Sequence, residues 1–231
     1  MTRTTDRRLF AGAAVVTLVV VFAGFYRTYY LRGFFTQVPL SAFLHVHGIV
    51  MTTWVAMLMA QVALVALGKV RWHRRLGVFG VAVASLVVVY GCLATFRAAA
   101  REYAGHTDNA SSQITVLGLE LTQMLLFALL VAVAIWMRSR SDYHKRLMLL
   151  ATAAMLPNPI SRLPISFDSN LVILLIFDGL LVAAIAYDTF RRGRVHPAFL
   201  WGGVLVLGGL HIAFAFAYSH TWHTLATRLI S

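Results

Sequence analysis

Long apolar runs separated by short basic segments constrain this chain more than any other feature of its sequence. Seven runs approach or exceed the roughly 20 apolar residues that a transmembrane helix needs. They lie at about residues 9–31, 40–68, 77–97, 113–137, 147–164, 170–189 and 198–219. Only 12% of the 231 residues are charged, whereas a soluble domain has about a quarter. The sequence therefore predicts an all-α polytopic membrane protein, a single bundle of seven transmembrane helices over residues 1–231. It excludes a soluble enzyme.

Positive charge divides unequally between the two sides of the predicted bundle. Fourteen Lys and Arg residues precede the first run or join runs two to three, four to five and six to seven, whereas six lie on the other side. Because cytoplasmic segments carry the excess of Lys and Arg, we expect the N-terminus in the cytoplasm and the C-terminus outside. The expected location is the bacterial inner (cytoplasmic) membrane. The net charge of +12 then indicates anionic lipid headgroups at the cytoplasmic turns as partners, and not nucleic acid.

Three of the basic turns contain one histidine each, namely His73, His144 and His196. Residues 72–76 (WHRRL) and 143–147 (YHKRL) are alike at a spacing of 71 residues, which suggests an internal duplication. These turns are expected either to bind headgroups or a partner protein, or to set the orientation of the bundle alone.

The fifth run contains Pro157 and Pro159 on either side of Asn158. Proline removes a backbone donor and kinks a helix, which a bilayer tolerates only where protein or water satisfies the freed carbonyl groups. We therefore expect this helix to break in its outer half and to face the bundle interior or a wet cavity.

Ionisable residues inside the spans converge on one depth. At about 1.5 Å of rise per residue, His45, His47, Glu120, Asp178 and His211 lie roughly 8–12 Å below the predicted outer boundary. The inner halves of the spans contain almost no ionisable residue. This pattern predicts a polar chamber in the outer half of the bundle, because intramembrane charges are costly and mark functional sites.

Two kinds of cofactor suit such a cluster. His47 and His211 come from non-adjacent spans at matching depth and are the predicted axial ligands of a b-type haem, with His45 as a further cofactor-binding candidate. Histidines and carboxylates together also suit zinc or iron. Alternatively, the cluster satisfies its own charges and binds nothing. The candidate metal ligands are Glu120, Asp178, His220 and His223.

Several stretches resemble an uncharacterised family of bacterial multi-pass membrane proteins. The resemblance implies the seven-span fold and no particular activity. The HKRLML turn at residues 144–149 also resembles small helical proteins linked to haem-copper oxidase assembly, which points to haem or respiratory membranes. The stretches that carry the family resemblance are Arg27–Leu31, His45–Gly48 with Trp54 and Gln61, His73–Gly77, His144–Ala151, and Arg192–Pro197 with Trp201–Gly203.

Three functional hypotheses follow. The first is a haem- or metal-binding protein for redox chemistry or sensing. The second is a non-catalytic subunit or assembly factor of a larger respiratory or energy-transducing membrane complex. The third, a zinc-dependent membrane hydrolase, rests on Ser41 and His45, whose spacing resembles that of the ceramidase and adiponectin-receptor group, although here the motif opens a helix instead of closing it. The single cysteine, Cys92, excludes an internal disulfide.

Overall fold

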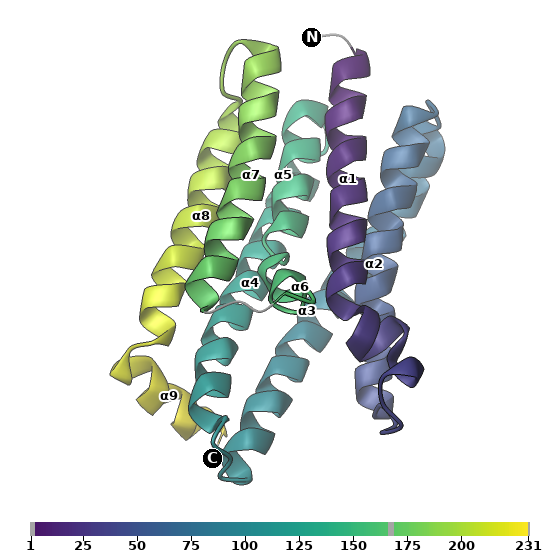
Figure 1. The fold of residues 1–231 in the computed structure, drawn as a ribbon. Helices are drawn as coiled ribbons and strands as arrows, with labels where there is room; N and C mark the ends of the chain where they lie inside the picture. The colour runs from purple at the N-terminus through teal and green to yellow at the C-terminus, as the bar shows by residue number, and fades with distance from the viewer. Residues whose placement is uncertain (1–2, 166–168, 231) are drawn as a thin grey trace.

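The computed structural model describes residues 3–165 and 169–230, and every regular element in these two ranges is a helix. The helices form one elongated bundle (Figure 1). In chain order they are α1 (Arg3–Phe25), the π-helix η1 (Tyr26–Tyr30), the 3₁₀ helix η2 (Arg32–Phe34), α2 (Ala42–Ala66), α3 (Val70–Ala104), α4 (Ala110–Trp136), α5 (Ser141–Ala153), α6 (Pro157–Ser161), α7 (Asn170–Arg192), α8 (Pro197–Ala217) and α9 (His220–Ile230).

Within the described residues, six helices are long and apolar enough to cross a membrane. They are α1 with its continuation to Tyr30, α2, α3, α4, α7 and α8. This confirms the prediction of an all-helical chain that can pass a membrane several times.

The fifth predicted run differs from a single helix over residues 147–164. Helix α5 begins earlier, at Ser141, and ends at Ala153, and the short α6 follows from Pro157. Pro157 and Pro159 have no backbone N–H to donate to the preceding turn, so α5 cannot continue into them, and a new helix begins with Pro157 at its first position. The predicted break is therefore confirmed, whereas the continuous span is corrected to two pieces.

Local sequence signals define several helix ends. Ser41 and Ser169 cap α2 and α7 by accepting hydrogen bonds from the backbone N–H groups of Leu44 and Val172. Helix α7 ends at Gly193, which has a φ of 71° that residues with a Cβ rarely adopt. Pro197 is the first residue of α8, where its missing N–H costs nothing.

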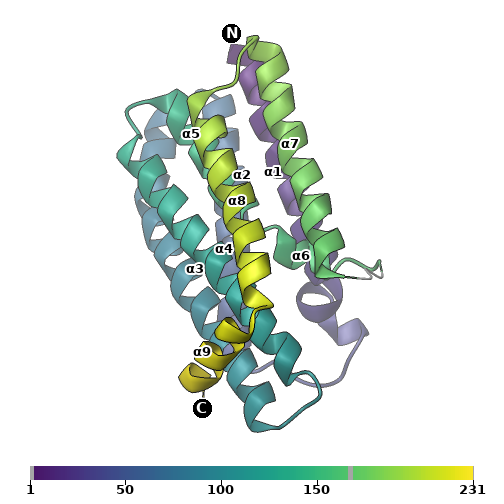
Figure 2. The ribbon, with the colours of Figure 1, turned by 90° about the vertical axis from the view of Figure 1, so that its left-hand side faces the viewer.

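The core lies around α4 and α5. Helix α4 packs against α3, α5 and α8, and α5 is enclosed between its neighbours (Figure 2). Phe127 of α4 and Leu150 of α5 are fully buried, and the Trp54 ring meets that of Phe127 edge to face at 4.9 Å. Small buried residues such as Ala151 and Ala154 let the helices approach closely. Close packing of this kind drives helix association in a bilayer, where the surrounding lipid tails are as apolar as the side chains.

The basic residues gather at one end of the bundle. The first turns of α1 and the connections α2–α3, α4–α5 and α7–α8 all lie at the upper end in Figure 1. These four segments, together with the helical turns that flank them in α3, α5 and α7, carry the fourteen basic residues counted in the sequence. We call this end the basic end.

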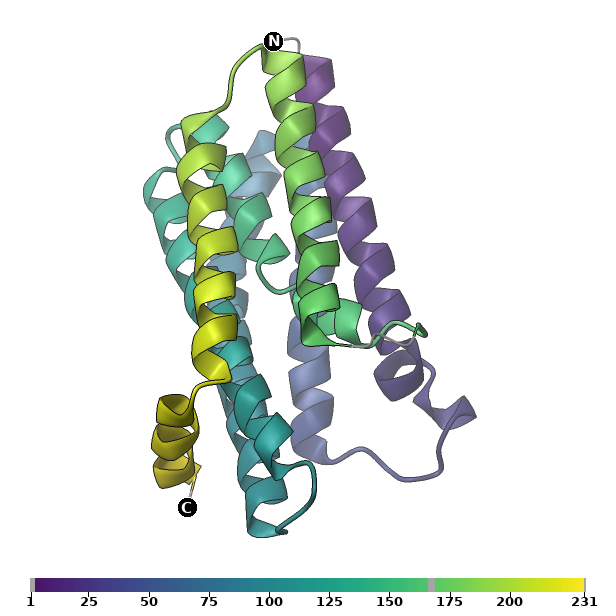
Figure 3. The same cartoon turned by 60° about the vertical axis from the view of Figure 1, so that its left-hand side comes forward.

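The opposite end is built differently. Helices α3 and α4 extend well past α6 and the start of α7, and α9 packs across them (Figures 1 and 3). Ala99, Leu117 and Ala226 form a small separate core there, and the Trp222 indole N–H donates to the backbone oxygen of Ile114 at 2.8 Å. This end is therefore tied together independently of the main core.

Candidate functional site

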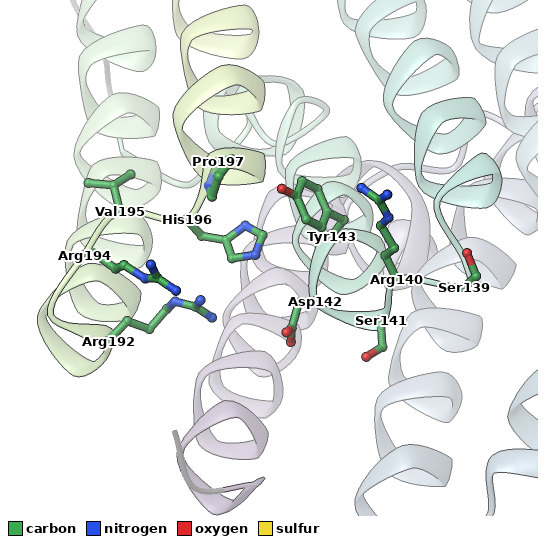
Figure 4. Close-up of a pocket in the computed structure, with 10 residues that line it drawn as sticks. All are labelled: Ser139, Arg140, Ser141, Asp142, Tyr143, Arg192, Arg194, Val195, His196 and Pro197. Atoms are coloured by element: carbon green, nitrogen blue, oxygen red, sulfur yellow. The ribbon is translucent and has the colours of Figure 1, made fainter.

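A cavity lies at the basic end, between the α4–α5 and α7–α8 connections (Figure 4). It has a volume of about 600 Å³. Two segments that are some fifty residues apart in the sequence form its walls. The lining residues are Ser139, Arg140, Ser141, Asp142, Tyr143, Arg192, Arg194, Val195, His196 and Pro197.

The lining is strongly cationic. Arg192 and Arg194 come from one wall and Arg140 from the other (Figure 4). The carboxylate of Asp142 forms an ion pair with the ammonium group of Lys145 at 2.9 Å, so its charge is largely offset. The cavity therefore favours an anionic ligand, and guanidinium groups match phosphate and carboxylate geometry especially well.

His196 is the N-terminal cap of α8 and is only 4% exposed. Its Nδ1 accepts a hydrogen bond from the backbone N–H of Ala198 at 3.1 Å. Burial, reinforced by the positive charges of Arg146 and Arg192, lowers the pKa of His196 to about 4. The ring is therefore neutral at pH 7 and carries its proton on Nε2. In Figure 4 the ring points toward Tyr143, and the two ring centroids are 4.8 Å apart.

The low pKa of His196 gives a directional pH dependence. Between the ordinary value of 6.5 and about 4, the unfolded chain binds a proton at this residue and the folded protein does not. The contribution of neutral His196 to the free energy of unfolding should therefore be fully present above pH 6.5. It should be lost progressively as the pH is lowered toward 4. Thermal unfolding in detergent at several pH values measures this. His196→Asn keeps a good helix cap but cannot titrate, so its unfolding temperature should fall less over this range. Equal pH slopes for the two proteins would contradict the assignment.

A fully buried ion pair supports the walls of the pocket. The Arg146 guanidinium donates to both carboxylate oxygens of Asp188, with distances of 2.5 Å from Nη2 and 3.1 Å from Nε. Neither side chain is exposed to any extent. Arg146 also donates to the backbone oxygen of Asp142 at 3.0 Å, and its guanidinium lies 5.5 Å from the ring centroid of Phe199. It thereby joins α5, α7 and α8, which carry the pocket.

This pair corrects the expectation that the inner halves of the spans contain almost no ionisable group. The sequence predicts Arg146 in a basic cytoplasmic turn, because the fifth apolar run begins at residue 147. The structure starts α5 at Ser141, which moves Arg146 into the bundle. The signal that could have revealed the pair is Asp188, a carboxylate within the apolar run of α7.

The predicted outer chamber exists in part. A smaller cavity of about 80 Å³ lies between α4, α6, α7 and α8, and Glu120 lines it. The carboxylate of Glu120 accepts a 2.5 Å hydrogen bond from the Asn158 amide, and the Arg162 guanidinium donates to the oxygen of the same amide. Glu120 therefore faces the interior as expected, but its direct partner is an amide and not a cation.

Asp178 and His211 form a separate pair. Their carboxylate oxygen and Nε2 are 3.3 Å apart, and the imidazole side chain is 45% exposed. The expected basic partner of Asp178 is thus present, but neither residue lines the cavity beside Glu120.

The structure does not bring His47 and His211 together. His47 Nδ1 lies 3.2 Å from the backbone oxygen of Tyr90 in α3, whereas His211 Nδ1 lies 2.9 Å from that of Leu207 in its own helix. Helix α2 packs against α1 and α3, and α8 packs against α4, α5, α7 and α9. The two helices lie on opposite sides of the bundle in Figure 1.

The other predicted ligands are also dispersed. His45 is exposed beside Tyr29, with ring centroids 6.2 Å apart. On α9, His220 lies near Thr224, and His223 Nε2 lies 3.1 Å from the Thr115 hydroxyl of α4. Among the described residues, no three His, Cys, Asp or Glu side chains form a group that could hold a metal ion.

Comparisons with protein-family models, with curated proteins and with solved structures found no match to this chain.

Proposed function

We propose that this protein crosses a membrane seven times, with its basic end in the cytoplasm, and binds a phosphate-bearing lipid headgroup in the cavity of that end. In this arrangement α5 and α6 together form the fifth crossing. Helix α5 starts at the basic end, and α6 lies level with the start of α7 (Figure 1), which supports a crossing made of two pieces. The distribution of Lys and Arg supports the orientation, and the resemblance to multi-pass bacterial proteins agrees with the number of crossings.

The cationic cavity carries the proposal. Arg140 and Arg194 line it from opposite walls, and neither side chain makes a hydrogen bond or ion pair to another residue in the described ranges. Neutral His196 and Tyr143 add donor groups that suit phosphate oxygens. A volume of about 600 Å³ is far larger than an inorganic phosphate needs, and it lies within the usual range of small-molecule sites. Lipids of the cytoplasmic leaflet supply such anionic headgroups at this depth.

Removing the two unengaged guanidinium groups tests the proposal. Each charge-assisted hydrogen bond contributes about 1.5–3 kcal/mol, so Arg140→Gln with Arg194→Gln should weaken binding of phosphatidylglycerol at least about tenfold. Binding is measured by native mass spectrometry of the detergent-solubilised protein titrated with phosphatidylglycerol or with phosphatidylcholine.

Arg71→Gln is the matched control, because Arg71 is exposed at the same end but does not line the cavity. It should bind phosphatidylglycerol as the wild type does. The proposal is wrong if the double variant keeps wild-type affinity, if the control loses as much, or if the wild type binds both lipids equally.

A further inference from the structure

Two arginines of the cavity at the basic end, called the headgroup cavity from here on, lie on opposite sides of a pair of rings. Arg140 directly precedes α5 and Arg194 follows α7, so each belongs to a different wall. In Figure 4 the rings of Tyr143 and His196 lie between the two guanidinium groups, and the ring centroids are 4.8 Å apart. A phosphate group bound by Arg194 is therefore separated from Arg140 by both rings.

The positive charge of the headgroup cavity exceeds the negative charge of one phosphodiester group. Neither Arg140 nor Arg194 makes a side-chain hydrogen bond or ion pair within the described part of the chain. Asp142, the one carboxylate among the lining residues, is paired with Lys145 at 2.9 Å and lies 3.8 Å from the Arg146 guanidinium. It therefore offsets neither arginine. One phosphodiester would leave a guanidinium group uncompensated, whereas two would neutralise both.

The groups between the two arginines are neutral and can form hydrogen bonds. His196 Nδ1 already accepts a hydrogen bond from the backbone N–H of Ala198, so the ring directs its remaining N–H, at Nε2, elsewhere. The Tyr143 hydroxyl can both donate and accept. Such groups suit an uncharged hydroxyl group that lies between two phosphates better than they suit a third charge.

Exposed apolar side chains lie next to the headgroup cavity on two helices. Trp136 ends α4 and precedes the lining residue Ser139 by three positions, and Leu200 and Trp201 follow Pro197 at the start of α8. All three apolar side chains are exposed. Tryptophan is typical of the boundary between lipid headgroups and acyl chains. This surroundings suits a ligand that has acyl chains.

The two separated arginines specify the kind of headgroup. Resting on the headgroup function proposed above, we propose that the ligand has two phosphodiester groups joined by a short linker with a hydroxyl group, as in cardiolipin (diphosphatidylglycerol). One phosphate binds Arg140, the other binds Arg194, and the linker lies against Tyr143 and His196. Because the phosphates are linked, the second contact forms at a high effective concentration and strengthens binding. Basic pockets on the cytoplasmic side of membrane helices suit headgroups of this class.

Native mass spectrometry of the detergent-solubilised full-length protein tests the two-phosphate ligand. Cardiolipin, phosphatidylglycerol and farnesyl diphosphate are titrated separately. The wild type should bind cardiolipin at least about tenfold more tightly than phosphatidylglycerol. Arg140→Gln and Arg194→Gln should each remove this advantage. Each should weaken phosphatidylglycerol binding by no more than about twofold, because a single phosphate can still use the other wall. Farnesyl diphosphate should behave like phosphatidylglycerol in the variants, because its two phosphates are joined directly and reach one wall only.

Arg138→Gln is the matched control, because Arg138 is exposed in the same connection as Arg140 but does not line the cavity. It should bind cardiolipin as the wild type does, and a loss equal to that of Arg140→Gln would overturn the inference. Equal wild-type affinities for cardiolipin and phosphatidylglycerol would also overturn it, as would a loss of cardiolipin in only one of the two single variants. A loss of farnesyl diphosphate as large as that of cardiolipin would do the same. These four results leave the headgroup function standing, whereas that function itself fails if neither anionic lipid binds more tightly than phosphatidylcholine.

Discussion

Replacing Arg146 with Met should lower the free energy of unfolding by about 3–5 kcal/mol, because the buried Asp188 carboxylate would lose its bidentate partner. Asp188→Leu should also destabilise the protein, because the guanidinium would lose its 2.5 Å partner and keep the more distant Asp142 carboxylate at 3.8 Å. Both side chains are completely buried, so water cannot replace the lost contacts. Denaturant unfolding in detergent micelles, followed by circular dichroism, measures the change.

Two further variants make this result specific. The double variant Arg146→Met with Asp188→Leu should recover most of the loss, because an apolar pair of similar volume avoids the desolvation cost of both charges. Lys145→Gln removes the ion pair with the exposed Asp142 and should change stability by about 1 kcal/mol or less. If the double variant is as unstable as the single variants, the stabilising effect of the pair does not come from mutual neutralisation of its charges.

Gly24→Ala should destabilise the bundle by about 1–3 kcal/mol, the usual range for overpacking. A Cβ at this position of α1 would overlap the backbone carbonyl group of Pro159 in α6. Because the obstacle is backbone, a side-chain rotation cannot relieve it, and α1 must move away from α6. The unfolding midpoint in detergent measures the loss.

Gly12→Ala on the same helix is the control. A Cβ at Gly12 meets no atom within 4 Å, so this change should be neutral or stabilising by about 0.5–1 kcal/mol through helix propensity. If Gly24→Ala is as stable as Gly12→Ala, the close contact between α1 and α6 is absent in the protein.

Properties that depend on one segment at a time could be predicted from the sequence. The length of each apolar run indicated most of the helices, and the prolines at 157 and 159 indicated the break between α5 and α6. The basic segments also share one end, as their alternation along the chain requires. These features can be read from the sequence because each depends on residues that are close together in the chain: the hydropathy of one run, or the missing N–H group of one proline.

The candidate sites could not be predicted in the same way, because they depend on which helices are neighbours. His47 and His211 were paired by depth alone, but equal depth does not determine lateral position, and α2 and α8 lie apart. The headgroup cavity joins residues near 140 to residues near 194. The burial of Arg146 does not follow from the sequence, because α5 begins at Ser141, six residues before the apolar run at 147, and these six residues include Arg146.

The sidedness of two exposed positions tests the central claim, namely seven crossings, the fifth of them made by α5 and α6, with the basic end in the cytoplasm. Val195 lies in the α7–α8 connection and is 44% exposed, and Ile165 follows α6 and is 62% exposed. Each is replaced by Cys in a Cys92→Ser background, and intact cells are treated with a membrane-impermeant thiol reagent before and after permeabilisation. We expect Cys at 165 to react in intact cells and Cys at 195 to react only after permeabilisation. Reaction of both positions from the same side, or of position 195 in intact cells, would contradict it.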